Sequence, residues 1–159
     1  MPIRVGQRIP SVPILIWQDG ELRPTTTDAI FGGRSVLLVC MPGAFTPTCS
    51  REHLPGYVAM SSRLRAQGIA VVCLAVNDPF VMHAWAEHHG AIGKVDLVPD
   101  GNAALTRALG LEFDASPLAM GVRCHRAALM VNDGEVTLVK IEPDPGVVTS
   151  TAAAACVPA

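Results

Sequence analysis

The sequence has no run of lysine and arginine, and no apolar stretch approaches the roughly 20 residues that a membrane span needs. The formal net charge is −2 at pH 7. Nucleic acids and anionic membrane surfaces bind through clustered positive charge, so we expect neither as a partner. The N-terminus also lacks a basic start followed by an apolar segment, and no signal peptide is expected.

The cysteines do not form a recognisable framework. There are five, an odd number, and their spacing matches neither a disulfide scaffold nor a zinc site. Thr46 and Glu52 lie three residues on either side of Cys49, so no partner cysteine completes a CxxC pair. We therefore expect a reducing compartment, the cytoplasm, rather than an oxidising one.

The chain is rich in apolar residues. The chain has 159 residues, of which 50% are hydrophobic and 16% charged. This length is typical of one domain with a sizeable core, and the composition excludes a disordered chain. We therefore expect a single domain over residues 1–159.

The hydrophobic pattern alternates between buried strands and helices. Strands are predicted at Val36–Cys40, Ile69–Val76 and Val95–Val98, because these runs are apolar and short. Asp-Gly pairs predict two hairpins, one joining strands near residues 12–17 and 21–24, the other joining strands at 126–132 and 135–141. Helices are predicted at residues 27–31, 47–67, 79–89, 102–109 and 149–156, with a kink at Pro55-Gly56 and Gly68 ending the second helix. Together these elements predict an α/β fold with a mixed central sheet and helices on both faces.

The segment between the first buried strand and the long helix carries the chemistry. Thr46 is a good N-cap residue and Pro47 suits the first helical position, so Cys49 falls in the first turn. There the free N–H groups and the helix dipole favour a thiolate. A thiolate held at a helix start is a nucleophile or a redox centre. A buried, inert cysteine is the alternative, although the polar setting opposes it.

The full string from Pro42 to Cys49, Pro-Gly-Ala-Phe-Thr-Pro-Thr-Cys, followed by His-Leu-Pro-Gly, resembles the active-site loop of peroxiredoxins. The family pattern Pro-x-x-x-Thr-x-x-Cys is filled by Pro42, Thr46 and Cys49. Further matches to the type II, peroxiredoxin-five-like branch follow in order: Val76–Met82, Asp100–Asn102, Ala108–Glu112 and Gly121-x-Arg123-x-x-Arg126. The resemblance covers about residues 3–150.

This resemblance implies a thioredoxin-like fold with an N-terminal β-hairpin extension, and a thiol-dependent peroxidase without metal, haem or flavin. Cys49 would attack hydrogen peroxide or a small alkyl hydroperoxide and become a sulfenic acid. Thr46 would orient the peroxide and contact the thiolate, and Pro42 would shield the cysteine from water. Arg126 would stabilise the thiolate and polarise the peroxide, although a solvated arginine at a strand end is the alternative.

Several residues near these motifs have two interpretations. Arg123 is a weaker site candidate than a structural charge. His53 is expected to make a structural hydrogen bond rather than to act in acid–base catalysis. Phe80 and Trp85 either line a dimer contact, as in relatives, or pack in the core.

The sequence does not identify the thiol that reduces the Cys49 sulfenate. Glutathione with glutaredoxin, or thioredoxin, would reduce the sulfenate, and a homodimer is expected from the resemblance. Cys73, Cys124 and Cys156 are candidate resolving cysteines; Cys124 would share a face with Arg126 if the segment between them is extended. Two other functions remain as alternatives: a thioredoxin-like disulfide oxidoreductase, disfavoured by the missing cysteine partner, and a peroxide-sensing or chaperone-like thiol protein with slow turnover.

Overall fold

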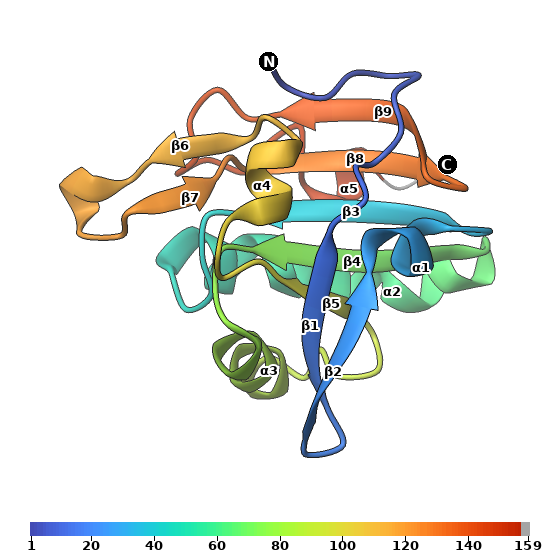
Figure 1. The fold of residues 1–159 in the computed structure, drawn as a ribbon, viewed down its shortest axis with the longest axis horizontal. Helices are drawn as coiled ribbons and strands as arrows, with labels where there is room; N and C mark the ends of the chain where they lie inside the picture. Colours follow the sequence, from blue (N-terminus) through green and yellow to red (C-terminus); the bar gives the residue numbers. More distant parts are fainter. Residues whose placement is uncertain (157–159) are drawn as a thin grey trace.

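The computed structural model describes residues 1–156, and a five-stranded mixed sheet forms its centre (Figure 1). The strand order is β5-β4-β3-β8-β9. The parallel strands are β3 (Ser35–Met41), β4 (Ile69–Ala75) and β5 (Asp96–Pro99). Strands β8 (Ala127–Asn132) and β9 (Glu135–Ile141) are antiparallel and complete the sheet. The predicted mixed sheet and its terminal hairpin are confirmed.

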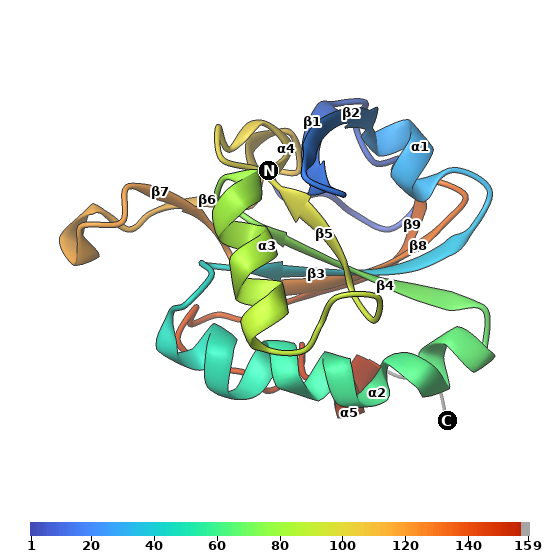
Figure 2. The ribbon, with the colours of Figure 1, turned by 90° about the horizontal axis from the view of Figure 1, so that it is seen from below.

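Two apolar cores lie on the two faces of this sheet, because side chains of a strand alternate between faces. In β3, Leu38 and Cys40 face one core, whereas Val39 and Met41 face the other. The first core is covered by the N-terminal hairpin, α1 (Thr27–Phe31) and α4 (Ala104–Ala108). The second is covered by α2 (Leu54–Ala66) and α5 (Ala153–Cys156), and α3 (Pro79–His88) contributes to it from the β5 side (Figure 2).

The N-terminal hairpin is formed by β1 (Pro13–Gln18) and β2 (Glu21–Thr26), as predicted. Asp19 and Gly20 make its two-residue turn, with φ angles of 53° and 77°. Positive φ at both positions is what a tight hairpin turn requires, and an Asp-Gly pair tolerates it. The Asp-Gly signal therefore placed this turn correctly.

The long helix begins with a distorted turn instead of a simple kink. Cys49–His53 forms a π-helical segment, in which the N–H of Leu54 bonds to the carbonyl of Cys49, and α2 continues from Leu54. Pro55 has no N–H to donate to the carbonyl of Arg51, so the wider π turn occurs where the α-helical bond is already missing.

Two predictions differ from the structure. Strands β6 (Glu112–Asp114) and β7 (Val122–Cys124), joined around a 3₁₀ turn at Ser116–Leu118, were not predicted, because three-residue strands carry no clear alternation. The last helix starts at Ala153 rather than Thr149, because residues 149 and 151 instead bind the side chain of Glu142. Over residues 1–156, no helix is both long and apolar enough to cross a membrane.

Candidate active site

The site lies at the carboxyl end of β3, in the loop that leads to the long helix. Met41 ends β3, and Phe45 adopts a φ of 61°, which is uncommon for a bulky residue. The N–H of Ala44 bonds to the Asn77 side chain at 2.9 Å, which ties the loop to the segment after β4. The N–H of Ser50 bonds to the carbonyl of Thr46 at 3.0 Å, so the helix begins where the sequence predicts.

Cys49 is fully buried on the α2 side of the sheet, and its thiol meets a guanidinium. The Nη2 of Arg126 lies 3.2 Å from Cys49 Sγ. As the third residue of the helix, Cys49 also has a backbone N–H without an intrahelical acceptor. The guanidinium thus places positive charge beside this sulfur at a helix start, where the helix dipole also favours an anion.

The Arg126 side chain is only 1% exposed, and hydrogen bonds to several elements hold it in place. Ala127 pairs with Cys40, so the register of β8 against β3 brings Arg126 beside the end of β3. Its Nε donates to the carbonyl of Pro145 at 2.9 Å, and its Nη1 bonds to His53 Nδ1 at 2.8 Å. These contacts with the C-terminal segment and with the helix fix the plane of the guanidinium that faces Cys49.

His53 is a neutral ring whose tautomer is set by its partners. Arginine only donates, so Nδ1 of His53 must accept from Arg126. The carbonyl of Thr151 only accepts, so Nε2 carries the hydrogen, at 3.1 Å from that oxygen. Burial, followed by the charge of Arg126, lowers the pKa of His53 to about 4. The predicted structural hydrogen bond is therefore present, and it is made to the arginine of the site.

Thr46 and Pro42, in the loop that precedes the helix, bond to groups other than the Cys49 sulfur. The Thr46 hydroxyl donates to the carbonyl of Gly43 at 2.6 Å, so the predicted cap through a first-turn N–H is replaced by this bond. Pro42 is buried, and its carbonyl lies 3.5 Å from Nη1 of Arg123. A side chain at Gly43 would come within 2.8 Å of the same Nη1, so Arg123 packs against the loop.

All five cysteines are buried and free, and they divide between the two faces of the sheet. Cys73 and Cys156 share the core that contains Cys49, whereas Cys40 and Cys124 belong to the opposite core. The expectation that Cys124 shares a face with Arg126 is wrong, because β7 ends at Cys124 and β8 starts only at Ala127, which interrupts the alternation. Burial, together with the neighbouring Cys49, raises the pKa of Cys73 well above its usual value.

The aromatic candidates separate into core and surface. Trp85 is fully buried, and its indole N–H donates to the Ser50 hydroxyl at 3.0 Å, directly after Cys49. Phe80 is 52% exposed and stacks against Trp17 with a centroid distance of 5.0 Å. Phe45, on the active-site loop, is 53% exposed. Trp85 thus belongs to the core, and the two phenylalanines lie on the surface.

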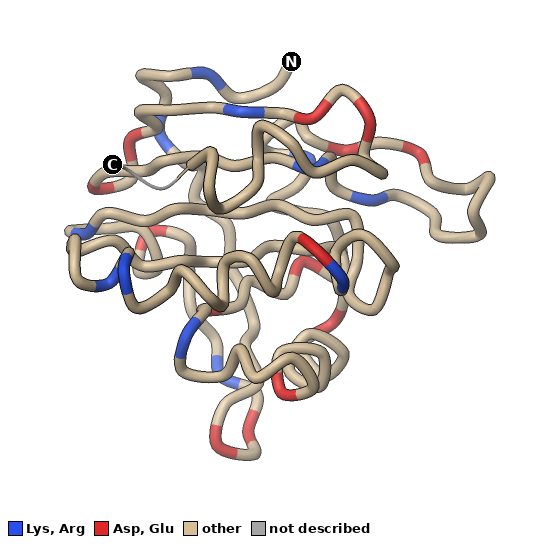
Figure 3. The backbone as a smooth tube through the Cα atoms, turned by 180° about the vertical axis from the view of Figure 1, so that it is seen from behind, with Lys and Arg blue, Asp and Glu red and all other residues tan. Residues whose placement is uncertain are grey.

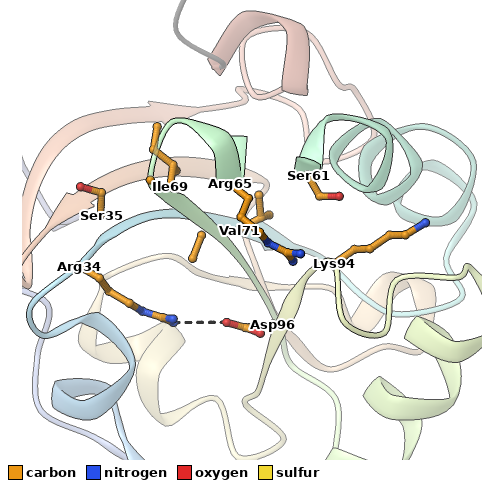
Figure 4. Close-up of a pocket in the computed structure, with 10 residues that line it drawn as sticks. Arg34, Ser35, Ser61, Arg65, Ile69, Val71, Lys94 and Asp96 are labelled. Carbon is orange, nitrogen blue, oxygen red and sulfur yellow. Dashed lines mark hydrogen bonds and ion pairs between the residues drawn. The ribbon is translucent and has the colours of Figure 1, made fainter. Parts of the chain in front are cut away.

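A hollow with basic side chains lies elsewhere and is not part of this site. Its lining includes Ser35, Ile69 and Asp96, the first residues of three parallel strands, so it lies at the edge opposite Cys49. Arg34 is paired with Asp96 at 3.4 Å, and the Lys94 side chain extends away from Arg65 (Figure 4). Figure 3 shows charged segments of both signs dispersed over the fold. The basic groups of the hollow therefore do not converge on one point.

Comparison with known proteins places this geometry in a family. The Redoxin family model matches residues 4–155. Peroxiredoxin-2E-2, chloroplastic, from rice is 44% identical over 94% of this chain and 69% of its own length. Peroxiredoxin sll1621 from Synechocystis is 45% identical over 82% of this chain and 66% of its own length. The chain belongs to the peroxiredoxin family.

A solved structure agrees with this assignment. Reduced Prx3 from Vibrio vulnificus, in complex with hydrogen peroxide, is 35% identical, covers 96% of both chains and superposes with a TM-score of 0.90. The thioredoxin-like peroxiredoxin fold with its N-terminal hairpin is thus established, and the chain is a thiol-dependent peroxidase. The sequence pattern did not single out Thr151 as a neighbour of the site, because it meets His53 from 98 residues away, and Glu142 is connected to the site through Thr151.

Proposed function

We propose that Cys49 is the peroxidatic thiol and that Arg126, Thr46 and Pro42 form its peroxide site. The 3.2 Å contact between Arg126 Nη2 and Cys49 Sγ, made between two buried groups at a helix start, carries this proposal. A buried guanidinium is costly unless an anion faces it, and the thiolate of Cys49 is the group that meets it.

The remaining donors and acceptors suit a hydroperoxide. Arginine has five N–H groups, and three bonds to protein atoms leave two for a ligand. Because the Thr46 hydroxyl gives its hydrogen to Gly43, its lone pairs are free to accept the peroxide O–H. Pro42 has no N–H, and its buried ring keeps water from the sulfur.

The reaction is a two-electron oxidation of sulfur. The Cys49 thiolate attacks the terminal peroxide oxygen, an S–O bond forms and the O–O bond breaks. The electron pair of that bond leaves on the distal oxygen, which takes the proton of the attacked O–H group and departs as water or an alcohol, leaving Cys49 as a sulfenate. Negative charge grows on the leaving oxygen, so Arg126 is most useful at that moment. Hydrogen peroxide and small alkyl hydroperoxides are the proposed substrates.

An external thiol is proposed to reduce the Cys49 sulfenate, with glutathione and glutaredoxin, or thioredoxin, as the source. Support comes from the other cysteines: Cys40 and Cys124 lie across the sheet, and burial disfavours the thiolate of Cys73. Glutathione would form a mixed disulfide with Cys49 and release the sulfenate oxygen as water. A second thiol would then restore Cys49.

Assembly and location are also proposals. The exposed rings of Phe45, on the active-site loop, and of Phe80, beside Trp17, offer apolar contact surface, which supports the expected homodimer. Five free cysteines suit a reducing compartment such as the cytoplasm, and the rice relative is named as chloroplastic.

The test is hydrogen peroxide consumption in the presence of dithiothreitol. Cys49→Ser should lose turnover and keep its circular dichroism spectrum, while Cys156→Ala, which removes another buried thiol, should retain turnover. Turnover that persists in Cys49→Ser would contradict the assignment. Supplying glutaredoxin with glutathione, and separately thioredoxin with its reductase, identifies the reductant.

A further inference from the structure

A buried carboxylate next to the site has no role in the reaction described above. Glu142 is 1% exposed and follows the end of β9. It accepts four hydrogen bonds of 2.7–2.9 Å, from the N–H and the hydroxyl of Thr149 and from the same two groups of Thr151. Burial alone would raise its pKa, but these bonds prevail and bring the pKa of Glu142 to about 2. It is therefore an anion at neutral pH.

These bonds fix the carbonyl of Thr151. Its N–H and hydroxyl bind Glu142, while its carbonyl oxygen accepts the Tyr57 hydroxyl at 2.6 Å and meets His53 Nε2 at 3.1 Å. Thr151 is fully buried, so these partners leave its peptide little freedom. This carbonyl accepts the hydrogen that His53 carries on Nε2, so its position holds the ring in the orientation in which Nδ1 meets Arg126.

His53 passes this constraint to Arg126. With its hydrogen on Nε2, the ring offers Nδ1 as the acceptor for Arg126 Nη1, at 2.8 Å. A second connection runs through the backbone, since the N–H of Glu142 bonds to the carbonyl of Arg126 at 2.9 Å. Glu142 thus acts on both the backbone and, through two residues, the guanidinium of Arg126.

We propose that Glu142 is a positioning residue for peroxide reduction. By holding residues 149–151 it fixes the orientation of the His53 ring, which in turn orients the Arg126 guanidinium toward Cys49. This inference rests on the proposed roles of Cys49 and Arg126. A small displacement of a group that acts in the transition state lowers the rate strongly, even when its cause lies outside the contact with substrate.

The test measures the oxidation of Cys49 by hydrogen peroxide in a single turnover, by stopped-flow fluorescence without reductant. Glu142→Ala removes all four acceptor contacts and should slow oxidation by about ten-fold or more. Glu142→Gln keeps one carbonyl oxygen where both backbone N–H groups bond, so it should stay within about three-fold of wild type. A carboxylate that acted through its charge could not be replaced by the uncharged glutamine, so a rate near wild type in Glu142→Gln distinguishes positioning from a charge effect.

A control variant separates positioning of the site from the general loss of a carboxylate that holds a loop. The exposed Asp114 also accepts a backbone N–H, from Ser116 at 2.8 Å, but it lies in the β6–β7 hairpin and not in the segment that contacts Arg126. Asp114→Ala should leave the oxidation rate within about two-fold. Equal slowing in Asp114→Ala and Glu142→Ala would overturn the proposal.

A double-mutant cycle tests the route through His53. In a His53→Leu background, Glu142→Ala should slow oxidation by less than about two-fold, because the link is already broken. If the slowing caused by Glu142→Ala multiplies the slowing caused by His53→Leu in the double variant, the route through His53 is overturned.

Should Glu142→Ala fail to fold, Thr149→Val takes its place, because it removes only one hydroxyl donor. A smaller slowing is expected for this variant, and an unchanged rate would count against the proposal. Fast oxidation in Glu142→Ala sinks this inference alone, whereas turnover in Cys49→Ser sinks the proposed function.

Discussion

The protonation of His53 should make folding stability fall in mild acid. In the unfolded chain a histidine has a pKa of about 6.5. In the folded protein, burial and the charge of Arg126 lower the pKa of His53 to about 4. Between these values the unfolded state binds more protons than the folded state, so stability rises with pH. The stabilising contribution is complete above pH 6.5 and is lost as the pH falls toward 4.

The size of the effect follows from linkage. The full difference of about 2.5 pKa units corresponds to about 3 kcal/mol, and lowering the pH from 7 to 5 should already remove about 2 kcal/mol from the free energy of unfolding. This window lies above the titration of Glu142: its pKa is about 2, and its own contribution is lost only at more acidic pH.

The measurement is urea unfolding of the reduced protein at pH 7 and pH 5, for wild type and for His53→Gln. A glutamine offers an oxygen to Arg126 and an N–H to the carbonyl of Thr151, and it does not titrate. Other histidines contribute equally to both proteins. The loss of stability between the two pH values should therefore be about 2 kcal/mol smaller in His53→Gln. The same loss in both proteins would refute a neutral, buried His53.

Three further predictions concern the reaction cycle. Arg126→Lys keeps the charge but loses the planar fork, and Thr46→Val loses the hydroxyl; stopped-flow oxidation should slow by about 10²–10³-fold in each, and rates equal to wild type would disprove the site geometry. The fully buried sulfur of Cys49 must become reachable after oxidation, so hydrogen exchange across residues 48–57 should be faster in the oxidised protein, whereas equal protection argues against local opening. Mass spectrometry after one equivalent of peroxide should show a Cys49 sulfenate or, with glutathione present, its adduct; a dominant disulfide with Cys73 would instead name an internal resolving cysteine.

The sequence by itself determined the features that depend on neighbouring residues. Pro47 suits the first helical position, the helix begins there, and Cys49 therefore lies in its first turn. The Asp-Gly pairs placed both hairpin turns, and the apolar runs identified the strands of the central sheet. Such signals act within a few residues, so they can be recognised without knowing the fold.

The tertiary structure alone decided which distant residues meet. Arg126 and Cys49 are 77 residues apart, and their contact depends on the register of β8 against β3. The two residues between β7 and β8 put Cys124 on the face opposite Arg126, which an extended segment would not have done. Because Thr149 and Thr151 bond to Glu142, the last helix begins later than expected. The same segment reaches His53 through the carbonyl of Thr151. These outcomes depend on packing between elements, and no local pattern encodes them.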